Sequence, residues 1–475
     1  MPGRVGEAVE PLVREIDYGD PLTAFAPLAE APCALFLDSA LGVSRLGRYS
    51  FIAAEPFHIL ESRDGALSLD GRGWSGNPFA ALRDLLARFP QRRLAQLPPF
   101  QGGVAGFFGY DLGRHLERLP RPRDDRADFA DLQLGCFDCV AAFDNLAQRA
   151  WIISSGYPEH EAGARRARAE ARASALAERL RAAPPLPALA EASGRGEAAI
   201  ANFTRPDYEA AVQRVIDYIH AGDIFQANLS QRFGARLPTG ETPFALYRRL
   251  RALNPAPFAA YLKFGRDVIA SSSPERFLKL SDGQVESRPI KGTRPRGRDA
   301  AEDEAMAQAL LASEKDRAEN VMIVDLLRND LSRVCRDSSV AVPELCVLER
   351  YATVYHLVST IVGQLRPGKT AVDLLEASFP GGSITGAPKI RAMEIIAELE
   401  PTRRGPYCGS IGYIGFDGDM DCSIVIRTYS IHGDQVSFQV GGGIVADSKP
   451  DEEYEETLAK GQALLAALAP GARIA

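Results

Sequence analysis

The sequence lacks any run of about 18 consecutive apolar residues, so it predicts no helix that crosses a membrane. It also lacks an excess of basic residues. Its 55 Lys and Arg are outnumbered by 62 Asp and Glu, and the formal net charge of −7 argues against nucleic-acid binding as the main role. Residues 1–20 include acidic side chains and no apolar segment, so we expect no secretory signal and a cytoplasmic location.

Cysteine is scarce and scattered, with seven in 475 residues. Only Cys136 and Cys139 form a CxxC pair, and no second pair stands at the spacing of a zinc ribbon. Their segment, LGCFDCVAAF, is strand-like, which favours packed thiols over a metal site. An odd number of thiols fits a reducing compartment.

The composition is that of a globular protein, with 46% hydrophobic and 25% charged residues, and the length suffices for two or three domains. We expect an N-terminal region over 1–157, a helix and linker over 158–200, and a third region over 201–475. The helix is predicted at 159–183, which is rich in Ala, Arg and Glu, and the linker at 184–199, which contains Pro, Gly and Ser. Nearly every chemical motif lies in the third region.

Strand-like and helical segments occur in blocks rather than in regular alternation, which predicts an α+β fold. Helices are expected at 207–223, at 302–335 as one long helix or two, and at 450–468. Strands are expected at 33–39, 50–56, 102–110, 139–145, 258–264, 267–273, 276–280, 352–365, 410–416, 423–431 and 435–445.

The segment SRPIKGTRPRG (287–297) places Lys291 in a turn bounded by proline and glycine. It follows SSSPERF (271–277), which contributes the carboxylate of Glu275. A lysine held near a carboxylate suggests amine chemistry. The alternative is a solvated basic loop, because four arginines surround the lysine.

Two predicted helices carry pairs of carboxylates on one face. Glu453, Glu456 and Lys460 are spaced three and four apart, and Asp316 and Glu319 are three apart. Two such pairs together offer the oxygen ligands that Mg²⁺ prefers. Each pair by itself is also typical of a salt-bridged surface.

Three glycine-containing or polar segments suggest an anion site. FPGGSITGAPKIRAMEII (379–396) is a glycine-rich turn that leads into a helix, where free backbone N–H groups favour an anion. GGGIVADS (441–448) offers further backbone N–H groups. Arg427 lies in a β-branched run, so a charge partner is expected for it.

Taken together, these segments resemble the chorismate-utilising enzymes, strongly over the C-terminal two-thirds and more weakly before it. The resemblance implies a two-layer β-sheet core with outer helices and a chorismate-binding catalytic domain at 201–475. It implies Mg²⁺ as cofactor, with Glu319 and Glu456 as direct ligands and Asp316 and Glu453 as water-mediated ones. It also implies a set of substrate-binding residues: Gln226, His356, Ser383, Thr385, Gly386, Tyr413, Arg427, Gly442, Gly443 and Lys460.

Within that family, Lys291 resembles the aminodeoxychorismate synthase component I branch, whereas anthranilate synthases carry alanine there. Gln226 stands where isochorismate and salicylate synthases carry a lysine that activates water, and glutamine cannot serve as that base. The segment 35–53 resembles the family's tryptophan-site region, with Ser39 as the expected contact. A plain packed strand is the alternative there.

The resemblance thus implies amination of chorismate at C4, with Lys291 as nucleophile at C2 and Glu275 as general acid. We expect desolvation and neighbouring cations, Arg288 or Arg294 together with the metal, to lower the pKa of Lys291. No G-x-C-x-G elbow is present, so ammonia is expected from a glutamine amidotransferase subunit in a heterodimer. Two other readings are anthranilate synthase component I and an inert regulatory subunit that binds chorismate or tryptophan.

Overall fold

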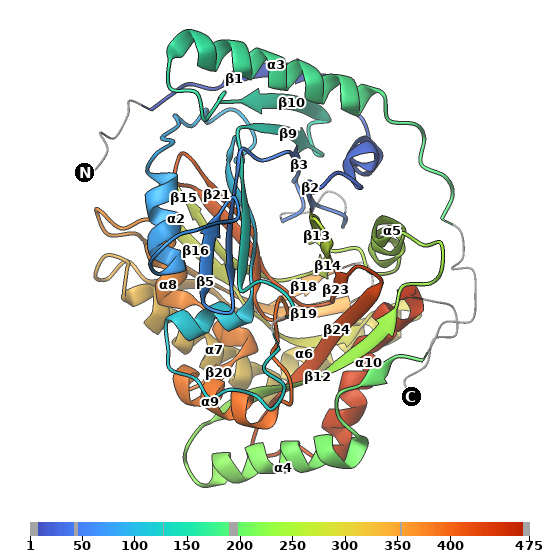
Figure 1. Cartoon of the computed structure of the whole chain (residues 1–475). Coiled ribbons are helices and arrows are strands. Elements are labelled where there is room, and N and C mark those ends of the chain that lie inside the picture. The colour runs from blue at the N-terminus through green and yellow to red at the C-terminus, as the bar shows by residue number, and fades with distance from the viewer. Residues whose placement is uncertain (1–7, 42–45, 127, 190–197, 352–353, 469–475) are drawn as a thin grey trace.

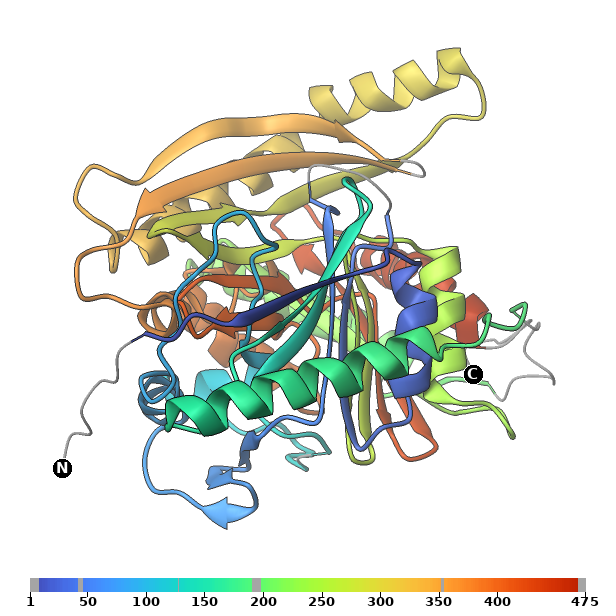
Figure 2. The ribbon, with the colours of Figure 1, turned by 90° about the horizontal axis from the view of Figure 1, so that it is seen from above.

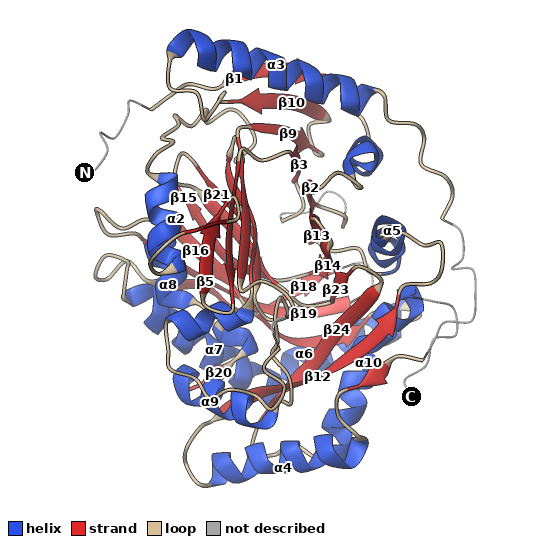
Figure 3. Cartoon of the chain, viewed as in Figure 1, coloured by secondary structure: helices blue, strands red, loops and turns tan. Residues whose placement is uncertain are grey.

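The computed structural model describes residues 8–41, 46–126, 128–189, 198–351 and 354–468. Its centre is two β-sheets of twelve strands each, and neighbouring strands are antiparallel throughout the two ladders (Figure 1). Helices lie on the outside of the sheets (Figure 3). The predicted α+β class with a two-layer sheet core is confirmed.

The first sheet has this strand order: β1 (Leu12–Ile16), β10 (Arg149–Ser154), β9 (Cys139–Asp144), β3 (Tyr49–Ala54), β2 (Cys33–Asp38), β13 (Phe258–Phe264), β14 (Asp267–Ser273), β23 (Thr428–His432), β24 (Gln435–Ile444), β12 (Gln226–Arg236) and β11 (Ile200–Ala201). The short β20 (Gly386–Ala387) also pairs with β12. The second sheet has the order β17 (Ile290–Pro295), β19 (Val354–Gln364), β16 (Gln284–Arg288), β15 (Arg276–Ser281), β22 (Met420–Ile424), β21 (Ser410–Gly415), β7 (Gly103–Phe108), β8 (Leu132–Phe137), β4 (His58–Arg63), β5 (Ala66–Leu69) and β6 (Arg72–Gly73), with β18 (Ala341–Arg350) on β19.

Strands from the two ends of the chain are neighbours in both sheets. In the first sheet β2 pairs with β13 from Cys33↔Phe264 to Asp38↔Ala259. In the second, β7 pairs with β21 from Gly103↔Gly415 to Phe108↔Ser410. The N-terminal third therefore supplies strands to both layers.

Ten α-helices cover these sheets in the described part of the chain: α1 (Pro21–Phe25), α2 (Pro78–Leu86), α3 (Ala162–Arg181), α4 (Arg205–His220), α5 (Pro243–Leu253), α6 (Ala300–Ala312), α7 (Glu314–Ser332), α8 (Ala371–Ser378), α9 (Lys389–Leu399) and α10 (Pro450–Leu468). One core packs α1, α3, α5 and α10 on the first sheet, and α3 crosses that side of the molecule (Figure 2). A second packs α2, α7, α8 and α9 on the other sheet, and a third fills the space between the sheets.

The predicted helix over 302–335 is two helices, because Ser313 ends α6 and begins α7. Its backbone is extended and its hydroxyl accepts a hydrogen bond from the backbone N–H of Asp316, which satisfies a free donor of the first turn. The helices predicted at 159–183, 207–223 and 450–468 correspond to α3, α4 and α10. Among the described residues, no helix is both long and apolar enough to cross a membrane.

The single strand predicted at 423–431 is wrong. The run is split into β22 and β23, which belong to different sheets, and the chain crosses between them at Val425–Arg427. Arg427 has a φ of 53°, in the left-handed region that a β-branched or charged residue seldom adopts. Apolar composition predicted a strand here, but the backbone turns to change layers.

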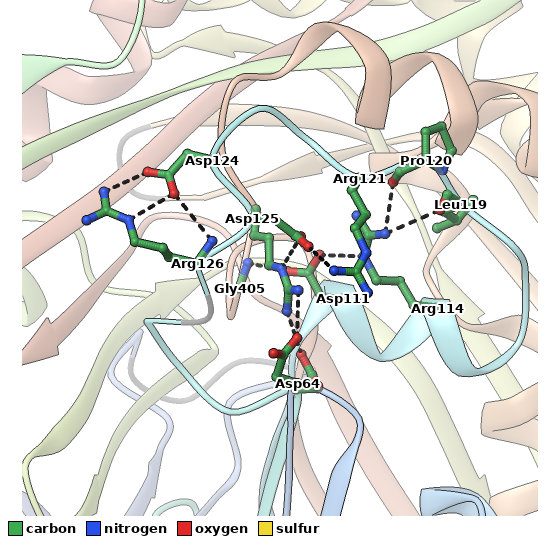
Figure 4. Close-up of polar contacts among 12 residues, drawn as sticks. Asp64, Asp111, Arg114, Leu119, Pro120, Arg121, Asp124, Asp125, Arg126 and Gly405 are labelled. Carbon is green, nitrogen blue, oxygen red and sulfur yellow. Dashed lines mark hydrogen bonds and ion pairs between the residues drawn. The ribbon is translucent and has the colours of Figure 1, made fainter.

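The segment after α9 is held by carboxylates (Figure 4). Arg403 donates to Asp125 at 2.6 Å and to Asp64 at 2.8 Å, and the backbone N–H of Gly405 donates to Asp111 at 2.8 Å. These bonds join the segment after α9 to the segment between β7 and β8 and to the turn between β4 and β5. A cavity of about 30 Å³ lies against Arg404 there, which is room for water.

Both thiols of the CxxC pair are buried, Cys136 in β8 and Cys139 in β9, as packed strand residues. Parts of two predicted segments, 42–45 in the tryptophan-site region and 190–197 in the linker, lie outside the described residues.

Candidate active site

Lys291 lies in a strand, so the predicted turn is wrong. Strand β17 pairs Ile290 with Val358 and Thr293 with His356 on β19, and the register shifts between them. Two residues, Lys291 and Gly292, therefore stand opposite the single residue Leu357. This is a β-bulge, a feature that bends a strand and redirects its side chains.

The amine of Lys291 faces three carboxylates. Burial lowers its pKa most, the charges of Glu319, Glu275 and Glu456 raise it, and Lys460 lowers it again, with a net shift downward. A cationic neighbour was predicted, but the choice of arginine is wrong.

The two predicted arginines are already paired with carboxylates. Arg288 is buried and donates to Glu344 at 2.9 Å and to Glu349, and Arg294 donates to Asp316 at 2.9 Å. Their charges are compensated by these carboxylates, and Lys460 is the cation among the main causes of the lowered pKa of Lys291.

Glu275 lies buried between β14 and β15, with 5% of its surface exposed. Burial raises its pKa to about 7, although the Ser383 hydroxyl, the charge of Lys291 and the backbone N–H of Ile290 each lower it. Ser383 donates to Glu275 Oε1 at 2.6 Å. The carboxyl group therefore carries a proton in a large share of molecules at neutral pH, which suits a general acid.

The glycine-rich turn brings β12 to the site. Thr385 donates its hydroxyl to the carbonyl of Gly381 at 3.0 Å, which closes the turn. Gly386, with φ 150°, pairs with Ala227 so closely that a Cβ would lie 2.1 Å from the carbonyl oxygen of Gln226. Only glycine fits this approach, and it places Gln226 at the wall of the site.

Gly443 lies beside both Gln226 and Lys291. A Cβ on Gly443 would lie 2.2 Å from Gln226 Nε2 and 3.5 Å from Lys291 Nζ. Gln226 is 1% exposed, and its Oε1 has no hydrogen-bond partner among the described residues. This amide oxygen can therefore accept a hydrogen bond from a ligand.

The first turns of α10 bring two carboxylates to Gly442. A Cβ there would lie 3.0 Å from Glu453 Oε2 and 3.4 Å from Glu456 Oε1. Glu453 is buried, which raises its pKa, and accepts a hydrogen bond from Ser448 at 2.6 Å. Burial raises the pKa of Glu456 as well, but Lys460 Nζ, 2.6 Å from Oε1, outweighs it and the net shift is downward.

Glu319 comes from α7 on the opposite side. Burial raises its pKa most, with further increases from Asp316 and Glu456, while Lys291 and Lys315 oppose them. The charge of Glu456 on α10 helps to raise the pKa of Glu319 on α7, and both carboxylates act by charge on Lys291. Carboxylates from the two helices therefore lie around the same amine. The two carboxylate pairs predicted from sequence do lie on helices, α7 and α10.

These carboxylates could supply two ligands to a hard cation, but they do not form a complete protein ligand set. Among the described residues, no three His, Cys, Asp or Glu side chains form a group that could hold a metal ion. Asp316 is bonded to Arg294, and Glu456 to Lys460. Mg²⁺, however, is commonly held by one or two carboxylates with waters and substrate, and Glu319 and Glu456 supply those two.

Arg427 acts by charge on His356. The side chain of Arg427 has one weak contact, 3.4 Å to Asn254 Oδ1, and no carboxylate partner among the described residues. His356 is buried, which together with the charge of Arg427 lowers its pKa to about 3. Its Nδ1 lies 2.8 Å from the Thr293 hydroxyl. The missing charge partner of Arg427 is what an anionic ligand would supply.

Two predicted site residues, Tyr413 and Ser39, make contacts within and beside the strands. Tyr413 packs in the core between the sheets, stacked on Phe100 at a centroid distance of 4.5 Å. Ser39 donates to the carbonyl of Tyr49 at 2.6 Å at the end of β2. Their hydroxyl and ring contacts are those of packed strands, and contacts with substrate or tryptophan stay predictions.

The sequence analysis missed residues that hold the site together. Ser448 fixes Glu453, Thr293 fixes His356, and Lys315 acts on Glu319, Glu453 and Glu456 by charge. Lys315 could have been found, because it precedes Glu319 by four positions and so shares its helix face. The other two depend on strand pairing.

Comparison with known proteins identifies relatives over almost the whole chain. The chorismate binding enzyme model matches residues 34–466. Anthranilate synthase component 1 of Thermus thermophilus is 43% identical over 95% of this chain and 96% of the relative. Aminodeoxychorismate synthase component 1 of Escherichia coli is 41% identical over 92% of this chain and 93% of the relative. The crystal structure of anthranilate synthase component I from Streptococcus pneumoniae TIGR4 superposes with a TM-score of 0.79 at 34% identity, over 88% of this chain and 92% of that chain.

Proposed function

Because this chain belongs to the chorismate binding enzymes, we propose that it aminates chorismate at C4 and releases 4-amino-4-deoxychorismate. In this proposal it is component I of aminodeoxychorismate synthase. The observation that carries the proposal is the pairing of Lys291 with Glu275. One is an amine whose pKa burial lowers, and the other a carboxyl group whose pKa burial raises to about 7.

These two shifts favour the protonation states that the chemistry needs. A neutral amine is nucleophilic, and a protonated carboxyl group can donate to a departing hydroxyl. The shifts share a cause, since desolvation disfavours the charged form of both groups.

The first half of the reaction forms a covalent adduct. The lone pair of Lys291 Nζ bonds to C2 of the ring, both ring double bonds shift by one position toward C4, and the C4–O bond breaks. The proton of Glu275 goes to the departing oxygen, which leaves as water. The resulting carboxylate of Glu275 then takes a proton from the alkylated ammonium of Lys291.

The second half reverses the substitution with another nucleophile. Ammonia bonds to C4, both ring double bonds shift back, and the C2–N bond breaks. Glu275 returns its proton to the departing Lys291 nitrogen, and loss of a proton from the new ammonium restores the balance. Gln226 has no basic nitrogen, so it cannot itself activate water for attack at C2.

The substrate carboxylates have two candidate partners. Arg427 faces the site without a carboxylate partner in the described chain, and a charge-assisted hydrogen bond is among the stronger polar contacts. Glu319 and Glu456 would hold Mg²⁺, with Asp316 and Glu453 outside them. When bound, the ion would supply positive charge to orient and polarise the other carboxylate.

The ammonia source in this proposal is a separate glutamine amidotransferase subunit. The relatives' names, which end in component 1, support a second component. Free ammonium should replace that subunit at mildly alkaline pH, where part of it is unprotonated.

Anthranilate synthase component I is the second candidate, and the 43% identical relative of that name favours it. The two activities differ in their products. We would incubate the purified chain with chorismate, Mg²⁺ and an ammonium salt, and identify the product by mass. A non-aromatic product that keeps the enolpyruvyl group supports the proposal, whereas anthranilate with free pyruvate would refute it.

A further inference from the structure

We propose that Gly292 is a positioning residue that sets the distance between the Lys291 amine and the carboxylate-bearing helix α7. This inference rests on the proposed function for its kinetic consequence. Its structural basis is the bulge of β17, in which Lys291 and Gly292 share the position opposite Leu357. Lys291 carries the reactive amine, and Gly292 is the residue that packs against the α6–α7 junction.

Gly292 has a φ of 89°, which L side chains rarely adopt. The strain of a positive φ would follow any substitution. At this position it would add to a second, steric effect, because the bulge turns the missing side chain toward two helices.

The steric effect is specific to the junction of α6 and α7. A Cβ on Gly292 would lie 3.0 Å from Asp316 Cβ and Cγ and 3.0 Å from Leu310 Cδ1. These are tighter than ordinary van der Waals contacts, so either the junction or the strand must move by a few tenths of an ångström. Asp316 cannot swing away freely, since Arg294 holds its carboxylate at 2.9 Å.

Such a movement would act on the pair that the chemistry needs. Glu319 lies one turn beyond Asp316 on α7, and its charge is the largest one acting on Lys291. The strand carries Lys291 and the helix carries Glu319, so separating the two changes where the amine lies and how it is solvated. Small errors of placement are costly for a nucleophile, about a hundredfold in rate for about 1 Å.

The matched comparison is Gly292→Ala against Gly265→Ala. Gly265 also has a positive φ, 61°, but a Cβ there would meet nothing within 4 Å. It lies in the hairpin between β13 and β14. Both variants should lose a similar amount of thermal stability from the backbone, while only Gly292→Ala should affect Lys291.

Two readouts decide the inference. In steady-state amination with ammonium, kcat of Gly292→Ala should fall about 10- to 100-fold, while KM for chorismate stays within about twofold of the wild type. Without chorismate, the rate at which a small amine reagent modifies Lys291, followed by peptide mass spectrometry, should change at least about threefold because the amine's solvation changes. Gly265→Ala should match the wild type in both.

An unchanged labelling rate of Lys291 together with an unchanged kcat in Gly292→Ala would overturn the inference. A wild-type product other than aminodeoxychorismate would refute the proposed function alone, and the labelling rate would still decide the position of Lys291. If Gly292→Ala is not recovered folded, Leu310→Ala is added to it to open the junction. That double variant is then compared with Leu310→Ala in the same two measurements, with the same outcomes for and against.

Discussion

Replacing Ser383 by alanine should raise the pKa of Glu275 and move the alkaline limit of amination to higher pH. The Ser383 hydroxyl donates to Glu275 Oε1 at 2.6 Å and so stabilises the ionised carboxylate. The wild-type pKa of Glu275 is raised to about 7 by burial in spite of that bond. Without the bond, burial is opposed only by Lys291 and the backbone N–H of Ile290.

The size of the effect follows from the strength of the lost bond. A hydrogen bond to a charged group contributes about 1.5–3 kcal/mol, and 1.36 kcal/mol corresponds to one pKa unit. The pKa of Glu275 should therefore rise by about one to two. Because the acid must be protonated to act, kcat of the wild type should fall as the pH rises above about 7. In Ser383→Ala the same fall should come about one to two pH units later.

The assay is the pH dependence of kcat at saturating chorismate, with ammonium corrected for its free-base fraction. Ser410→Ala is the control, because Ser410 is also buried and donates at 2.8 Å to the carbonyl of Ser423. It should leave the alkaline limit in place. An alkaline limit in Ser383→Ala that stays put or moves to lower pH would refute the assignment of Glu275 as the acid.

Lys291→Ala should form no covalent adduct in quenched intact-mass spectra and should lose at least about a hundredfold in amination; an adduct of unchanged mass would contradict its role. Glu319→Gln should weaken Mg²⁺ binding at least about tenfold by calorimetry, and an unchanged affinity would remove it from the metal site. Arg427→Met should raise KM for chorismate about 10- to 150-fold, since it removes a charge-assisted bond. Gly386→Ala should lower the free energy of unfolding in urea by at least about 2 kcal/mol, because its Cβ would lie 2.1 Å from the Gln226 carbonyl.

Two of these variants have matched controls in the same chain. Asp325→Asn changes a carboxylate on α7 that is exposed and paired with Arg328, so Mg²⁺ affinity should not change. Gly418→Ala introduces the same side chain at a positive φ of 93° with nothing within 4 Å. A loss of stability in Gly418→Ala as large as in Gly386→Ala would show that backbone strain alone is responsible.

Local periodicity predicted the parts of the site that lie within single helices. Glu453 and Glu456 lie three apart on α10, and Asp316 and Glu319 three apart on α7, so each pair could be placed on one face before any fold was known. That carboxylates of α7 and α10 lie around the same lysine is a result of tertiary structure. It depends on the pairing of β12 with β24 and of β17 with β19, at separations no local pattern contains.

The turn predicted around Lys291 failed for a physical reason. Pro289 and Pro295 suggested a loop, but Pro289 immediately precedes β17 and Pro295 ends it, where proline costs no ladder hydrogen bond. Gly292 suggested a turn, and its positive φ serves a bulge instead.

The carboxylate partners of Arg288 could not be predicted from local sequence either. Glu344 and Glu349 lie on β18, 56 and 61 residues later in the chain.

The interleaving of early and late strands has a consequence for synthesis on the ribosome. Cys33 in β2 pairs with Phe264, and Gly103 in β7 pairs with Gly415. At a translation rate of about 5–20 residues per second, the edge of β7 waits on the order of 15 to 60 s for β21. During that interval apolar strands with unpaired backbone groups stay open to other chains. Cellular yield of this protein should therefore depend on translation speed and on chaperones that cover nascent strands, more than on the stability of the finished fold.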